Sequence, residues 1–220
     1  MSVRLRRPIS LAVLLVSGAV GANLAFLGLG KVFGYPDVLD DPPAEVLASF
    51  AAHRPAVIAL FTLLAVSAGL LAPIAVLLGR RARTPGAGRL ITVVGVAAAA
   101  VQVVGLLRWP LIVPFVHDPD TFHTLNVVLG RTIGETLGYL GTAAFTVLVV
   151  RELTGREFGR FIALLGIVSA ALVACGVLVP LDVPGADFAN FAGYVLWSGW
   201  LLALAVEWVP AAQPSIASSR

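Results

Sequence analysis

Six long apolar blocks alternate with short polar stretches along the 220 residues of this chain. A helix needs about 20 predominantly apolar residues to cross the hydrocarbon core of a bilayer, and each block is close to or above that length. The blocks occupy residues 9–30, 56–79, 90–113, 127–150, 161–179 and 191–209. The pattern therefore predicts an all-α polytopic integral membrane protein with six transmembrane helices in one bundle.

The composition leaves little chain for a soluble domain. Hydrophobic residues make up 59% of the sequence and charged residues 12%, whereas soluble domains carry roughly 25% charged residues. We therefore expect one membrane domain over residues 1–209. The remaining stretch, residues 210–220, contains mostly Pro, Ser and Ala, and we expect it to be a disordered cytoplasmic tail.

The basic residues lie mostly on one side of the predicted membrane. Along a path through six spans, eleven of the fifteen Lys and Arg residues fall on the side that holds both termini. The connections on the opposite side contain only two basic residues, Lys31 and Arg54. Because cytoplasmic loops carry the excess of Lys and Arg, both termini are predicted to be cytoplasmic. The net charge of +3 then reports orientation rather than binding to nucleic acid.

The first outer connection is the longest and contains a helix signal. Asp41 is a candidate N-cap, with Pro42 at the first helical position. Val46, Leu47 and Phe50 share one face at helical spacing. Residues 41–54 are therefore predicted to form a short amphipathic helix on the outer surface, with a plain connector as the alternative.

Two charged residues, Arg131 and Glu135, lie one helical turn apart inside the fourth span. Charged side chains at membrane depth are costly and usually mark functional or paired positions. A base before an acid near a helix N-terminus is the less favourable order for an isolated helix. Tertiary contacts or a ligand must therefore account for the pair. Arg108 falls at a similar depth in the third span, since each helical residue adds about 1.5 Å of rise.

These charges are predicted to share one polar layer in the outer half of the bundle. One carboxylate facing two guanidinium groups leaves a net positive charge for an anion or a lipid head group. Three interpretations stay open, namely a structural fastener between helices, a ligand or substrate site, and a proton or ion pathway. The candidate ligand-binding residues are Arg108, Arg131, Glu135, Tyr139 and Asn23.

The fourth span also carries Gly130, Gly134 and Gly138 at intervals of four residues. Small residues at this spacing let a neighbouring backbone approach closely, so the stripe predicts helix packing. The neighbour could belong to this chain or to a second copy in a homo-oligomer.

Several chemistries lack the residues that they need. His53, His117 and His123 all lie in outer connections, so no imidazole is available for a haem between spans or for an intramembrane Ser–His pair. Residues 117–123 include metal-competent side chains without a trusted ligand spacing, and we expect them to be solvated loop residues. The single Cys175 excludes an intramolecular disulfide. We assign no catalytic residue, no metal site and no cofactor.

Four stretches of the chain are distinctive: YPDVLDDPPAEVL at 35–47, GLLRW at 105–109, GETLGY at 134–139 and GYVLW at 193–197. In this order they resemble a bacterial family of multi-span membrane proteins known as domain of unknown function 4386. The resemblance implies a compact helical protein of the bacterial cytoplasmic (plasma) membrane, with no established activity. It also draws attention to Tyr35, Asp37, Arg108, Trp109, Glu135 and Tyr139.

The sequence favours a binding or accessory protein with an outward-facing polar pocket for a lipid head group or small anion. Its expected partners are membrane lipids, such a ligand, and a second copy of the chain. One alternative is a small-solute or ion transporter, which would favour interrupted helices and structural repeats. Another is a membrane enzyme acting on an outer-leaflet lipid with Glu135 as general acid or base, although a second catalytic group is not definable.

The predicted topology can be tested by cysteine accessibility in whole cells. A Thr84→Cys variant should resist an impermeant thiol reagent added outside, because the arginine-rich loop at 80–89 is predicted to be cytoplasmic. The unsubstituted chain, which contains Cys175 alone, gives the background. Labelling of position 84 from outside the cell would refute the topology.

Overall fold

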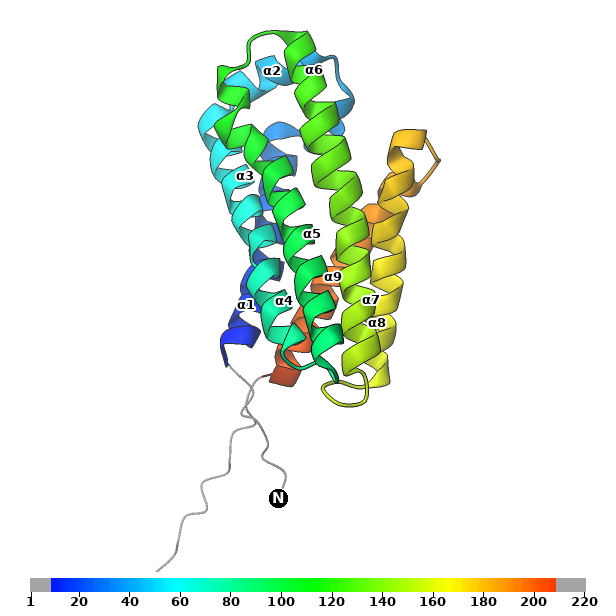
Figure 1. The fold of residues 1–220 in the computed structure, drawn as a ribbon. Coiled ribbons are helices and arrows are strands. Elements are labelled where there is room, and N and C mark those ends of the chain that lie inside the picture. The colour runs from blue at the N-terminus through cyan, green and yellow to red at the C-terminus, as the bar shows by residue number, and fades with distance from the viewer. Residues whose placement is uncertain (1–8, 209–220) are drawn as a thin grey trace, which may run out of the picture.

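The computed structural model describes residues 9–208, which form helices joined by short turns (Figure 1). Six helical segments in this range are long and apolar enough to cross a membrane, which confirms the predicted all-α polytopic bundle. They are Ser10–Phe33, Arg54–Gly79, Pro85–Phe115, Pro119–Leu153, Arg160–Leu181 and Ala186–Trp208. The tail predicted for residues 210–220 lies outside the described residues.

Spans one, three and six consist mainly of one α-helix each. These helices are α1 (Ile9–Phe33), α5 (Pro85–Leu111) and α9 (Ala186–Trp208), and the short 3₁₀ segment η2 (Val113–Phe115) follows α5. Span five is α8 (Arg160–Ala174) continued by the 3₁₀ segment η4 (Cys175–Leu181).

Span two is interrupted near its middle. Its two helices, α3 (Arg54–Gly69) and α4 (Leu71–Gly79), meet at Leu70. Pro73 explains the break, because a proline ring clashes with the carbonyl group four residues earlier and supplies no N–H to the helix. That carbonyl belongs to Gly69, the last residue of α3.

Span four begins at Pro119, earlier than the apolar block at 127–150 predicts. It runs through α6 (Pro119–Leu125), the π-helix η3 (Asn126–Leu137) and α7 (Gly138–Leu153). The Asp118 carboxylate accepts a hydrogen bond from the Thr121 backbone N–H at 2.8 Å and caps α6. The expectation that residues 117–123 form a solvated loop is therefore wrong for α6. The aspartate–proline start signal lies outside the apolar block, which is why the block alone misses it.

The six spans close into a ring. Along this ring α1 packs against α3, α3 and α4 against α5, and α5 against α7 and η3. α7 then packs against α8, α8 against α9, and α9 returns to α1 (Figure 1). α5 contacts both halves of spans two and four, so its side chains are central to the packing.

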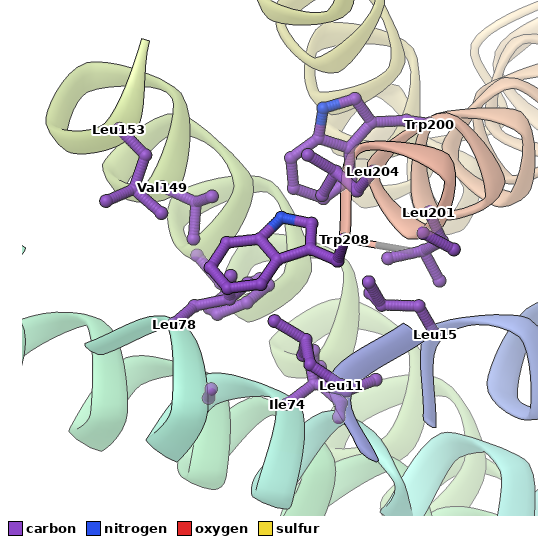
Figure 2. Close-up of a cluster of buried hydrophobic side chains, with 14 of the residues drawn as sticks. Leu11, Leu15, Ile74, Leu78, Val149, Leu153, Trp200, Leu201, Leu204 and Trp208 are labelled. Carbon is purple, nitrogen blue, oxygen red and sulfur yellow. The ribbon is translucent and has the colours of Figure 1, made fainter. Parts of the chain in front are cut away.

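The apolar core is divided into two clusters at opposite ends of the bundle. In one of them Trp208 lies among side chains from α1, α4, α7 and α9 (Figure 2). The other surrounds Trp109, which is fully buried and stacks on Phe61 with ring centroids 4.8 Å apart. Aromatic pairs of this kind stabilise a fold by more than the burial of their apolar area alone.

We call the second end of the bundle the cap end, because η1 (Asp37–Asp40), α2 (Pro43–Ala52) and α6 lie over it (Figure 1). The predicted amphipathic helix is present as α2. Val46 and Phe50 are buried on its inner face, and the Phe50 ring lies 5.8 Å from the Trp109 ring. One detail of the prediction is wrong, since α2 begins at Pro43 and Asp41 does not cap it.

The glycine stripe of span four faces α5 of the same chain. A Cβ atom at Gly134 would lie 2.9 Å from Gly105 Cα, and one at Gly138 would lie 2.7 Å from Gln102 Cγ. A Cβ atom at Gly130 would lie 2.7 Å from Arg108 Nη2. The contact positions are spaced by three residues on α5 and by four on span four, a pairing of ridges and grooves that aligns helices closely.

Adding one methyl group should test this contact. Gly134→Ala should lower the melting temperature in detergent, because the backbone of α5 leaves no room for a Cβ atom. The matched control is Gly199→Ala in α9, where a Cβ atom would meet nothing within 4 Å. That control should be neutral or stabilising, since alanine favours helix over glycine by about 1 kcal/mol. Equal melting temperatures for the two variants would contradict the close contact.

Candidate functional site

A cavity of about 360 Å³ opens at the cap end. Its walls come from three separate parts of the chain, namely η1 with the start of α2, α6, and the first turns of η3. The volume lies within the range of small-ligand sites, roughly 300–1,000 Å³. The lining residues are Leu39, Asp40, Asp41, Pro42, Pro43, Val46, Phe122, His123, Asn126, Val127 and Arg131.

The cavity carries charges of both signs. Arg131 Nη2 lies 3.8 Å from Asp40 Oδ1, and both side chains are substantially exposed, at 43% and 86%. Asp41 adds a second carboxylate to the lining and His123 adds an imidazole. Among residues 9–208 no group of three or more His, Cys, Asp or Glu side chains could hold a metal ion. The cavity therefore presents acceptors for a cation beside a guanidinium donor for an anion.

One asparagine of the cavity lining is hydrogen-bonded to a buried arginine. Asn126 lines the cavity and is only 7% exposed, and its Oδ1 accepts a hydrogen bond from Arg108 Nη2 at 2.8 Å. A guanidinium group only donates, so this bond fixes which end of the amide faces Arg108. The amide nitrogen is the remaining end, and within the described chain it has no protein acceptor. Asn126 can therefore donate to a ligand.

Arg108 is itself almost fully enclosed, at 3% exposure. Its Nη1 donates to the Gly105 carbonyl at 2.5 Å, while its Nε has no hydrogen-bond partner within residues 9–208. An arginine keeps its charge in proteins, so this position holds a permanent positive charge inside the bundle. Buried charges are costly unless they are paired.

Glu135 supplies a negative charge that compensates for the charge of Arg108. It lies close enough to Arg108 and Arg131 for both positive charges to act on its carboxylate. Neither arginine forms an ion pair with Glu135 within 4.0 Å in the part of the chain that is described. Arg131 pairs with Asp40 instead. The charges therefore form an inner couple of Arg108 with Glu135 and an outer couple of Arg131 with Asp40.

Tyrosine side chains surround the inner couple. Tyr35 follows α1 and lies near Glu135 and Arg108. Burial raises the pKa of the Tyr35 phenol above its usual range, the Glu135 charge raises it further, and Arg108 acts in the opposite direction. Tyr35 therefore stays a neutral hydrogen-bond donor at physiological pH. Deeper in the bundle, the rings of Tyr139 and Tyr194 lie 5.8 Å apart.

A glycine of the π-helix η3 leaves room for the contact between Arg108 and Asn126. A Cβ atom at Gly130 would lie 2.7 Å from Arg108 Nη2 and 3.0 Å from Asn126 Oδ1. The hydroxyls of Thr132 and Thr136 donate to the carbonyls of Val127 and Arg131, five residues earlier, at 3.0 and 2.8 Å. π-helical turns occur frequently at functional sites.

The structure does not bring the predicted site residues together in one place. Arg131 lines the cavity, and Arg108 lies directly behind its floor. Glu135 and Tyr139 are near Arg108 but are not part of the lining. Asn23 belongs to a separate contact, where its Nδ2 donates to Ser198 Oγ at 2.9 Å.

Asn126 was missed at the sequence level because the predicted span began after it. The helix signal at Asp118 and Pro119 would have placed it within the fourth helix. Asp40 as partner of Arg131 had no sequence signal, because the two residues are far apart in the chain.

Comparison with known proteins places the chain in a family. The model of the family described as "Domain of unknown function (DUF4386)" matches residues 11–205. The chain therefore belongs to this family, which confirms the resemblance seen in the sequence. No curated protein matches the chain, and no solved structure does.

The electrostatic couple between Arg108 and Glu135 can be tested by a double-mutant cycle. Glu135→Gln should lower stability by about 1–3 kcal/mol, because Arg108 loses a compensating negative charge. Glu45→Gln, at an exposed position of α2, is the control and should have little effect. Part of the loss should be recovered when Arg108 is also replaced by Gln, and less when Arg131 is.

The measurement is the free energy of unfolding in detergent for the single and double variants. Simple additivity of Glu135→Gln with Arg108→Gln would contradict the couple.

Proposed function

We propose that this member of the DUF4386 family binds, in the cap-end cavity, the head group of a lipid that carries both a phosphate and an ammonium group. In this role it is a binding or accessory membrane protein. The phosphate is held by Arg131 and the Asn126 amide, and the ammonium by Asp40 and Asp41.

The observation that carries this proposal is the Asn126 amide, oriented by a buried arginine at the floor of a cavity. Arg108 donates a hydrogen bond to Asn126 Oδ1, so the amide N–H groups of Asn126 are directed away from Arg108. Its positive charge lies behind them. Donors that are fixed in advance bind an anionic group without the cost of ordering side chains.

The charges on the lining favour a head group of both signs over a small anion. Two carboxylates, Asp40 and Asp41, line the same cavity as Arg131. A bare anion would meet both of them. A phosphate joined to an ammonium group satisfies the two signs together, and opposite charges at short range attract most strongly where water is scarce.

The position of the cavity suits a lipid head group. Val127 and Val128 on η3 are exposed by 36% and 47%, which gives this helix an apolar outer surface beside the cavity. Acyl chains can lie along such a surface while the head group enters the cavity. The volume of about 360 Å³ accommodates a head group rather than a whole lipid.

We also propose that the cap end faces outward from a bacterial plasma membrane. What supports this is the set of arginines at the opposite end, in the loops between α4 and α5 and between α7 and α8. An excess of arginine in short loops is typical of the cytoplasmic side. The termini then lie in the cytoplasm.

Transport is the second candidate, because four spans contain irregular segments. Span two breaks at Leu70, span three ends in η2, span four contains η3, and span five ends in η4. Transporter sites are often built from such discontinuous helices. An impermeant reagent added from the arginine-rich side that modified Asn126→Cys would favour transport over binding alone. An enzymatic role for Glu135 has less support, because Glu135 does not line the cavity.

Binding can be measured with a short-chain lipid and a matched pair of arginine variants. Purified full-length protein in neutral detergent is titrated with dioctanoyl phosphatidylethanolamine, and the melting temperature is followed. Arg131→Gln should weaken the apparent affinity by about tenfold, the effect of losing one charge-assisted hydrogen bond. Arg54→Gln removes an equal charge from an exposed position that is outside the cavity lining and should leave the affinity unchanged.

Asn126→Leu should also weaken binding, since it removes the oriented donor. The proposal fails if the unsubstituted protein shows no shift with this lipid, or if Arg131→Gln and Arg54→Gln bind it alike.

A further inference from the structure

A second hollow, of about 450 Å³, lies at the opposite end of the bundle. It is formed where α4 ends and α5 begins, on both sides of the turn that joins them. The hollow is independent of the cap-end cavity and shares no residue with it. Its lining residues are Val76, Gly79, Arg80, Ala82, Arg83, Thr84, Pro85, Gly88, Arg89 and Thr92.

Three arginines converge on this hollow without any acidic neighbour in its lining. Arg80, Arg83 and Arg89 are exposed, and none of them has an ion-pair partner among the described residues. Arg81, in the same turn, differs. It lies 4.0 Å from Glu157 and 4.8 Å from the centre of the Trp208 ring, and it is not part of the lining. The arginines that line the hollow are therefore the ones left available to a ligand.

Glycines bring the two helices close together beside the hollow. A Cβ atom at Gly79 would lie 2.6 Å from the Gly88 carbonyl oxygen, so the backbones of α4 and α5 approach closely at the base of the hollow. Toward the membrane the lining changes to Val76 and Thr92. Leu90 and Val93, exposed by 50% and 56%, continue the apolar surface of α5 beside it.

From this arrangement we propose that the hollow binds the phosphate of an anionic phospholipid from the leaflet at this end of the bundle. Guanidinium groups match phosphate oxygens in charge and geometry. Basic pockets between transmembrane helices are suited to anionic head groups, and juxtamembrane basic residues are attracted to anionic lipids. The acyl chains lie against the apolar surface of α5 while the head group meets the arginines.

Orientation in the membrane requires arginines at this end but does not require them to share a hollow. Arg151 near the end of α7 and Arg160 at the start of α8 lie at the same end of the bundle and are exposed, yet they are not part of the lining. They supply a control with equal charge. The double variant Arg83→Gln/Arg89→Gln loses two lining arginines, and Arg151→Gln/Arg160→Gln loses two outside it.

The experiment is a titration of full-length protein in neutral detergent with dioctanoyl phosphatidylglycerol, following the melting temperature. Dioctanoyl phosphatidylcholine and inorganic phosphate are titrated in parallel. The lining variant should bind phosphatidylglycerol about tenfold or more weakly than the unsubstituted protein, from the loss of two basic residues near the head group. The control variant should keep the affinity of the unsubstituted protein.

Three results would overturn the proposal. Equal losses in the two double variants would show that only the overall charge of this end matters. Phosphatidylcholine and phosphate can also bind the cap-end cavity, so what counts is the affinity that the lining variant loses relative to the unsubstituted protein. An equal loss for phosphatidylcholine and phosphatidylglycerol would remove the preference for an anionic lipid. An equal loss for inorganic phosphate and phosphatidylglycerol would assign the hollow to a free anion rather than to a lipid. Because the lining variant leaves the cap-end cavity intact, its response to phosphatidylethanolamine should not change.

Discussion

A positive charge that cannot be removed by deprotonation lies inside an apolar bundle at Arg108, and the cap end is arranged around it. The side chain is 3% exposed, so the surroundings must compensate for lost hydration. Gly105 and Asn126 supply oxygen acceptors, and Glu135 supplies a nearby negative charge. The contacts with Asn126 and Glu135 depend on the close approach of α5 and the fourth span. The glycines at their crossing are therefore a condition for burying the arginine, as well as a packing device.

The same constraint links packing to binding. Because Arg108 holds Asn126, the amide is fixed before any ligand arrives. Arg131 forms no ion pair with Glu135 and pairs at the surface with Asp40 from the first connection. That contact joins η1 to η3 across the cavity. A ligand that replaces it must satisfy a carboxylate and a guanidinium together, which is the reason for proposing a head group with both charges.

The sequence predicted the fold well because apolar length dominates the energetics of a membrane span. The six blocks, α2 and the glycine stripe all follow from local pattern. The fourth span was placed too short because Asp118 to Asn126 is polar, although it begins with a helix-start signal. The i to i+5 bonding of η3 has no signature in the local sequence pattern. Depth along the spans places Arg108 near Glu135, but it does not predict that Arg131 pairs with Asp40 or that Asn23 contacts Ser198.

The most direct test of the account is an experimental density map of the full-length protein reconstituted in nanodiscs that contain phosphatidylethanolamine. We expect head-group density in the cap-end cavity, with phosphate oxygens within hydrogen-bonding distance of the Asn126 amide nitrogen and the Arg131 guanidinium. The ammonium end should lie beside Asp40 and Asp41. A well-resolved cavity without lipid density, with the Arg131–Asp40 contact intact, would contradict the account.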